Sequence, residues 1–362
     1  MPECASNGYR RFMGDILCNI SAFRFHRVPP QVQMLLPMLP TPELDPNRRH
    51  LSEHPLVSEI LGSPVHMLRD ARTRSRSGAR IIRHVWSGEL PACAIMDTNL
   101  GIETATPLFT LLTMAPSVSE YRLIMAMYEM CGTFCVFQPS KMIESLLDRA
   151  YGERTLDPSY GWKRLVDASG RKTNLWKRSP LIELDELAKY ACAVTGMRGA
   201  KGFTKAATAV SGVAASPFEV QGSMLLGMSR RRGGNAFDIE NNVQLTLNRG
   251  ARLVSGREKR YGDIVITSKD GTRSVVLEFQ GEAFHGSVEA KIMDADRTTS
   301  LQIMGYQVIQ VTYGQIHDAQ KYSELVGLIE RLLGMEHRGK TYGQREREMQ
   351  MRREIFAPWE SF

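Results

Sequence analysis

The chain has 362 residues, a length that suits two domains or one large one. Hydrophobic residues make up 43% and charged residues 23% of it, an ordinary globular balance with enough apolar material for more than one core. No apolar run reaches about 18 residues, so we expect neither a membrane-spanning helix nor a membrane partner.

The net charge of +7 favours polyanionic partners, and it is unevenly distributed. Residues 1–205 carry 26 Lys and Arg against 20 Asp and Glu, whereas residues 206–340 carry 16 against 15. We therefore expect attraction to phosphate to be spread over the N-terminal part.

Six cysteines are present, and only Cys131 and Cys135 are close in sequence. No second pair lies at zinc-ligand spacing. A metal or redox pair is one interpretation. Small buried side chains in a reducing cytoplasm are the favoured one, and we expect a cytoplasmic protein.

The N-terminal part begins with a proline-rich stretch at 28–47, which predicts an irregular connector. Residues 56–105 predict short strands and loops. Helical spacing of apolar residues follows over 107–128, where Pro116 should divide it into two helices. Two further helices are predicted, over 141–151 and 182–195.

A linker rich in glycine and basic residues follows at 196–206, and we place a domain boundary there. The predicted parts are an N-terminal mixed domain, 1–205, a second domain, 206–340, and a charged tail, 341–362, that is helical or disordered. The sequence does not fix the role of the first domain, and recognition of DNA or of a partner is one interpretation.

The second domain should begin with a helix, because Ser216 precedes Pro217 as a cap and Glu219 follows in the first turn. Asp270-Gly271 lies between two apolar runs and predicts a β-hairpin. The elements predicted after the first helix are strands at 243–247, 262–267 and 274–279, a helix at 289–304, a strand at 307–312 and a helix at 321–333.

The predicted hairpin carries two carboxylates. Asp263 shares a strand face with Val265, Glu278 shares one with Gln280, and folding about the turn brings Asp263 and Glu278 together. Such carboxylates repel unless a cation lies between them. Their oxygens suit Mg²⁺ or Mn²⁺, which would hold a phosphate oxygen and lower the pKa of an attacking water.

Three neighbouring groups complete this hypothesis. The carbonyl of Phe279 is a candidate third ligand, and Glu219 would complete the metal shell or hold a second ion. Gln280 cannot act as a base but can orient the water. The alternative to a metal site is that Asp263 and Glu278 are ordinary solvated carboxylates at strand ends. For Glu219, the alternative is that its position at a helix N-terminus is favoured by the helix dipole alone. Arginine or lysine partners that sealed both hairpin carboxylates would argue against a metal site.

Several motifs occur here in order: SPFE at 216–219, GDIV at 262–265, LEFQG at 277–281 with His285, Asp294-x-x-Arg297, and GYxVIxVT at 305–312. This ordered set resembles the very-short-patch-repair-like (Vsr-like) branch of the PD-(D/E)xK endonuclease superfamily, over about one third of the chain. The resemblance implies a restriction-endonuclease-like core, a mixed central sheet flanked by helices.

The resemblance also implies residue roles. The metal ligands would be Asp263, Glu278 and Glu219. Gln280 takes the place usually held by Lys, or by Asp in this branch, and so removes a charged group from the site. His285 would lie at the edge of the site, and Arg297 would brace the site or contact phosphate.

The three substrate-binding candidates also have simpler structural interpretations. His285 is also a polar residue after a strand, and Arg297 is one helical turn from Asp294, which suits an ion pair. Arg231, in the arginine run 230–232, either contacts a phosphate backbone or belongs to a solvated helix end.

The N-terminal part resembles abortive-infection (AbiEi-like) antitoxin and transcriptional-regulator chains at residues 21–27, 84–86 and 129–132. Such chains usually begin with a winged helix that reads DNA. Because there is no room for one before Ser21, we do not expect a helix-turn-helix reader here.

We therefore predict an α+β protein that is an Mg²⁺- or Mn²⁺-dependent endonuclease and hydrolyses DNA. Its catalytic residues would be Asp263, Glu278, Gln280 and Glu219, and its substrate-binding residues His285, Arg297 and Arg231. The alternative is a non-catalytic DNA-binding regulator or antitoxin-like protein that retains a nuclease fold. The sequence does not separate DNA from RNA, nor set the oligomeric state.

Overall fold

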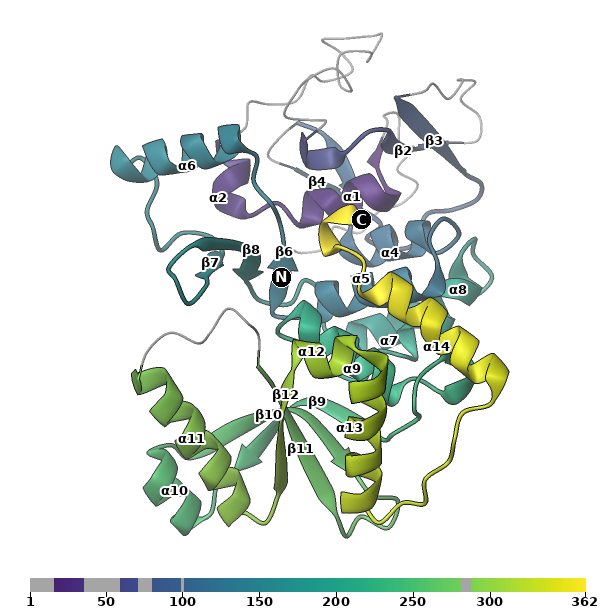
Figure 1. The fold of residues 1–362 in the computed structure, drawn as a ribbon. Coiled ribbons are helices and arrows are strands. Elements are labelled where there is room, and N and C mark those ends of the chain that lie inside the picture. Colours follow the sequence, from purple (N-terminus) through teal and green to yellow (C-terminus); the bar gives the residue numbers. More distant parts are fainter. Residues whose placement is uncertain (1–15, 36–58, 71–79, 99–100, 281–287) are drawn as a thin grey trace.

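The computed structural model describes residues 16–35, 59–70, 80–98, 101–280 and 288–362 (Figure 1). Within these ranges the protein mixes helices with three separate sheets, which agrees with the predicted α+β class. The predicted site residue His285 lies outside the described residues.

The first sheet has the strand order β3-β2-β1-β5-β4. Its strands are β1 (Ile16–Leu17), β2 (Val65–Asp70), β3 (Ile81–Trp86), β4 (Ile95–Asp97) and β5 (Glu103–Ala105). The helices between and after its strands in sequence are α1 (Asn19–His26), α2 (Pro30–Gln33), α4 (Pro107–Met114) and α5 (Glu120–Cys131), of which α1 and α4 contact the sheet. Pro116 falls between α4 and α5, so the predicted division of this helical stretch is confirmed.

The second sheet is antiparallel, with the order β6-β8-β7, and was not predicted. Its strands are β6 (Phe134–Val136), β7 (Lys163–Val166) and β8 (Lys172–Lys177). The helices around it in sequence are α6 (Lys141–Gly152), α7 (Leu184–Ala193) and α8 (Ala200–Ala207). Helix α8 occupies most of the stretch expected to be a linker, and it buries Phe203.

The third sheet has the order β12-β11-β10-β9; β9, β10 and β11 are antiparallel neighbours, while β12 runs parallel to β11. Its strands are β9 (Ile239–Thr246), β10 (Lys259–Thr267), β11 (Ser274–Gln280) and β12 (Gln307–Thr312). The predicted hairpin is present, and Gly271 adopts a φ of 70° in its turn, a conformation that favours glycine.

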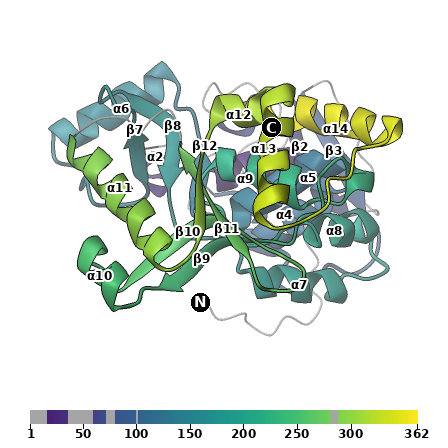
Figure 2. The same cartoon turned by 60° about the horizontal axis from the view of Figure 1, so that its bottom comes forward.

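Helices cover both faces of the third sheet (Figures 1 and 2). One face carries α10 (Arg249–Ser255) and α11 (Val288–Ile303). The other carries α9 (Pro217–Gly227), α12 (Tyr313–His317) and α13 (Ala319–Leu332). Along β10, Ile264 and Ile266 enter the main core, whereas Val265 joins Leu301 of α11 in a smaller cluster. Strand alternation therefore directs Asp263 to the α11 side.

The main apolar core continues across the predicted domain boundary, with members from Ile16 to Phe362. Helix α14 (Tyr342–Ile355) packs against α5, and the following residues bury Trp359 and Phe362. The tail expected from residue 341 on therefore contributes to this core. No helix in the described ranges is long and apolar enough to cross a membrane.

Candidate metal and nuclease site

Asp263 and Glu278 meet on the α11 side of the hairpin. The register pairs Ile264 with Leu277 and Val265 with Val276, so Asp263 and Glu278 are the next positions facing one another. The Oδ2 atom of Asp263 also accepts a hydrogen bond of 2.8 Å from the backbone N–H of Phe279, which fixes the Asp263 carboxylate against β11.

Arg297 reaches both carboxylates from helix α11. Its Nη2 atom lies 3.1 Å from Asp263 Oδ1 and 2.5 Å from Glu278 Oε2. The side chains of Arg297, Asp263 and Glu278 are 31%, 21% and 10% exposed. The two carboxylates therefore share one cation already, but the arginine that supplies it is accessible to solvent. The expected ion pair with Asp294 involves a side chain outside the described residues.

Glu219 is held by the start of its own helix. Ser216 caps α9 by accepting a hydrogen bond of 3.2 Å from Glu219 N. In return, Oε1 of Glu219 accepts from Ser216 Oγ at 2.9 Å and Oε2 accepts from Ala215 N at 2.7 Å. Both carboxylate oxygens are thus bonded locally, which gives Glu219 a structural role whatever its chemistry.

Burial and mutual repulsion shift the carboxyl groups of this cluster. Desolvation, followed by the charge of Asp263, raises the pKa of Glu219 to about 7 and that of Glu278 to about 8. Desolvation also raises the pKa of Asp263, against the opposing charge of Arg297. Asp263 and Glu278 share one arginine, and the buried carboxyl of Glu219 adds to their repulsion, so the cluster favours further protons or positive charge.

Desolvation lowers the pKa of Arg297, but the charges of Glu278 and Asp263 outweigh it and raise that pKa above its usual range. The guanidinium therefore stays charged at any pH of interest. It is a permanent cation at the centre of the cluster.

The remaining predicted residues divide into near and distant ones. Gln280 ends β11 and is half-buried, about 7 Å beyond Glu278 on the same face. Arg231 is exposed in the short helix η2 (Arg230–Arg232), past the C-terminal end of α9, whereas Glu219 lies at the N-terminal end. The structure thus does not bring Arg231 to the carboxylates.

The donor groups around Asp263 and Glu278 decide whether a divalent cation could be held there. No group of three or more His, Cys, Asp or Glu side chains is placed to hold a metal ion within the described ranges. The hairpin nonetheless offers hard carboxylate oxygens, and Oε1 of Glu278 is buried without a hydrogen-bond partner among these residues. The chemistry of these oxygen donors is compatible with a hard divalent cation such as Mg²⁺ or Mn²⁺.

The pair Cys131 and Cys135 does not form a second candidate site. Both thiols are free and buried. Burial raises the pKa of Cys131 to about 12, so its thiol stays protonated. This environment agrees with the favoured interpretation as small buried side chains.

A chain of buried and partly buried hydrogen bonds, not predicted from the sequence, connects α5 to α9. Tyr128 Oη and Ser211 Oγ are 2.8 Å apart, and Ser211 Oγ donates to Asn241 Oδ1 at 2.8 Å. Asn241 Nδ2 then donates to Ser223 Oγ, which donates to the carbonyl of Glu219 at 2.7 Å. These residues are far apart in sequence, so no local pattern could have identified them.

The carbonyl of Tyr261 is a further unpredicted participant. It accepts a hydrogen bond of 2.7 Å from Arg297 Nη2, the same atom that contacts the two carboxylates. A backbone oxygen carries no sequence signal, so only the structure could reveal it.

No protein-family model, curated protein or solved structure matches this chain. A function for the protein therefore has to be inferred from the cluster around Asp263 and Glu278, from its charges, and from the elements that position it.

Proposed function

We propose that this protein is a divalent-metal-dependent nuclease of the PD-(D/E)xK type that hydrolyses DNA phosphodiester bonds. The observation that carries the proposal is the convergence of Asp263 and Glu278 on one cationic position, the Nη2 atom of Arg297. Acidic side chains on adjacent strands seldom meet in a half-buried place unless they serve a cation.

The order of elements supports the same proposal. Along the chain, α9 is followed by β9, α10, the antiparallel hairpin β10–β11, helix α11 and strand β12, which pairs parallel to β11. The carboxylates lie on this hairpin, and Glu219 lies in the first turn of α9. This order supports the restriction-endonuclease-like core that the sequence resemblance implies.

Four residues of the chain would have separate roles in metal binding and in positioning the attacking water. Asp263 and Glu278 would hold Mg²⁺ or Mn²⁺, which supplies polarisation of a phosphate oxygen and a lowered pKa for water. Gln280, on the same face, would orient the water by hydrogen bonding. Glu219 adds negative potential behind Asp263 and fixes the start of α9.

The test is cleavage of supercoiled plasmid, single-stranded DNA and RNA by the whole chain with Mg²⁺ or Mn²⁺. Asp263→Ala and Glu278→Ala should each lower the cleavage rate by about 100-fold or more, the size of effect seen when a group that stabilises the transition state is lost. Glu240→Ala is the matched control, because Glu240 is an exposed carboxylate on β9 of the same sheet. Equal cleavage by all variants would refute the proposal.

A second candidate function is favoured by the contacts of Arg297. Because this arginine already pairs with both hairpin carboxylates, the cluster can persist without a metal, as it would in a non-catalytic DNA-binding regulator. Binding of DNA with no turnover in any divalent metal, unchanged by Glu278→Ala, would favour this alternative.

A further inference from the structure

Three oxygen atoms surround the Nη2 atom of Arg297. Asp263 Oδ1 lies at 3.1 Å, Glu278 Oε2 at 2.5 Å and the carbonyl oxygen of Tyr261 at 2.7 Å. Carboxylate and carbonyl oxygens are also the protein ligands that hard divalent cations bind. The guanidinium nitrogen therefore occupies a position built from metal-type donors.

The arginine is delivered to this position by helix packing. Leu301, four residues after Arg297, is fully buried against the sheet in the cluster that contains Val265 and Val276. Residues four apart share a helix face, so α11 aims Arg297 at the same side of the hairpin. The contact of Arg297 with the two carboxylates therefore follows from the packing of α11 against the sheet.

The arrangement leaves polar atoms unsatisfied. Glu278 Oε1 and Arg297 Nε are both buried, and neither has a hydrogen-bond partner among the described residues. A buried polar atom without a partner costs about 1–3 kcal/mol. A closed, purely structural ion pair would normally use these atoms. Within the part of the chain that the structure describes, the pairing of Arg297 with the carboxylates therefore leaves one donor and one acceptor unused.

We propose that Arg297 is a resident counter-ion that competes with the divalent cation for Asp263, Glu278 and the Tyr261 carbonyl, and that metal binding displaces its guanidinium. The inference rests on the proposed metal-dependent nuclease function. When both carboxyl groups are ionised in the metal-free protein, Arg297 reduces the repulsion between them. Its partial exposure gives the displaced side chain a path to solvent.

The experiment is titration of the whole chain with Mn²⁺ and with Mg²⁺ by isothermal calorimetry, at one pH. Arg297→Gln removes the competing charge while keeping a long polar side chain, so it should tighten Mn²⁺ binding by about tenfold, which corresponds to about 1.4 kcal/mol. Arg297→Lys keeps the charge and should bind within about threefold of the unaltered protein. Arg249→Ala, at the exposed start of α10, is the matched control and should change nothing.

The outcomes separate the two proposals. If the unaltered protein binds Mn²⁺ and Glu278→Gln abolishes that binding, but Arg297→Gln binds no tighter, the counter-ion inference is overturned and the metal site stands. If neither the unaltered protein nor Arg297→Gln binds Mn²⁺ or Mg²⁺, both proposals fail. Tighter binding by Arg297→Gln alone supports the inference.

A measurement on the unaltered protein keeps the inference testable should Arg297→Gln not fold. The Nε–H resonance of Arg297, assigned by its disappearance in Arg297→Lys, should move on saturation with Mg²⁺ because the guanidinium leaves the carboxylates. A resonance that stays in place while Mg²⁺ binds would overturn the inference.

Discussion

At the residue scale, Glu278 links the chemistry of the cluster to stability. Its carboxyl is buried beside Asp263, and its pKa rises from 4.5 to about 8 on folding. Below pH 4.5 this carboxyl is protonated in both states. Between these two values the folded protein keeps a proton that the unfolded chain has released, so the free energy of unfolding should fall as the pH rises through this window.

The variant Glu278→Gln should remove much of this decline, because an amide does not titrate. Urea unfolding at pH 5 and pH 8 would measure it, and the unaltered protein should lose at least about 1 kcal/mol more than the variant between these values. Glu240→Gln, an exposed carboxylate on the same sheet, serves as control. Equal pH dependence in Glu278→Gln and the unaltered protein would contradict the prediction.

At the element scale, the site depends on close packing of α9 against β11. Gly222 of α9 faces the Phe279 ring, and a Cβ atom added at Gly222 would clash with that ring. Phe218, one turn earlier, packs edge-on against Phe279 with 4.9 Å between the ring centroids. The aromatic contact therefore sets how near Glu219 comes to the hairpin.

Gly222→Ala should consequently destabilise the protein by about 1–3 kcal/mol, because the helix must move away from β11. Gly327→Ala is the matched control in α13, where the added Cβ meets only the flexible end of Arg331 at 3.6 Å. This second change should stabilise the protein by up to about 1 kcal/mol. Thermal unfolding of both variants measures the difference in their stability. Equal melting temperatures for Gly222→Ala and Gly327→Ala would show that Gly222 does not pack closely against Phe279.

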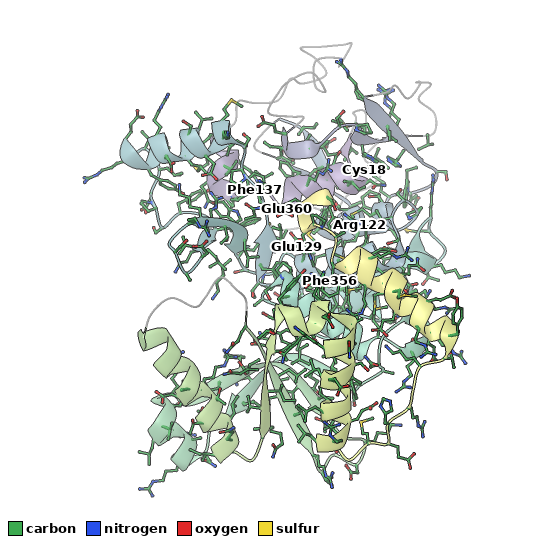
Figure 3. The ribbon with its side chains drawn as sticks, in the orientation of Figure 1. Cys18, Arg122, Glu129, Phe137, Phe356 and Glu360 are labelled. Atoms are coloured by element: carbon green, nitrogen blue, oxygen red, sulfur yellow. The ribbon has the colours of Figure 1, made fainter. Side chains whose placement is uncertain are left out.

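At the scale of the whole molecule, buried contacts join the two predicted domains and the C-terminal residues. Arg27 and Glu129 form a buried ion pair with distances of 2.9 and 2.5 Å, and Arg27 also donates to the carbonyl of Trp359 at 2.9 Å (Figure 3, where Glu129 is labelled). The chain of hydrogen bonds from Tyr128 to Glu219 crosses the predicted boundary near residue 205.

We therefore expect the chain to unfold in a single transition. All four tryptophans lie outside residues 206–340, so their fluorescence reports the rest of the molecule, while hydrogen exchange of β11 amides reports the third sheet. Both probes should give the same midpoint in denaturant. A fragment of residues 206–340 should fail to fold cooperatively, since its face toward α5 would be uncovered. Two separate midpoints, or a stable fragment, would favour independent domains.

Local sequence signals predicted most of the third sheet and the helices beside it. The strand at 307–312 was predicted to the residue, and the hairpin and α13 to within a few residues. Alternating apolar residues and an Asp-Gly turn act over short distances, so the sequence contains them directly. The short helices α10 and α12 and the second sheet were missed, because their few buried residues make no sustained period.

The sequence by itself determined that Asp263 and Glu278 occupy facing strands of one hairpin, because strand alternation and the turn are local properties. Only the tertiary structure decided that Arg297 Nη2 and the Tyr261 carbonyl meet them, and that Arg231 lies elsewhere. It also decided that residues 341–362 complete the core of the N-terminal part. These outcomes depend on how helices pack over long sequence separations, which no local pattern encodes.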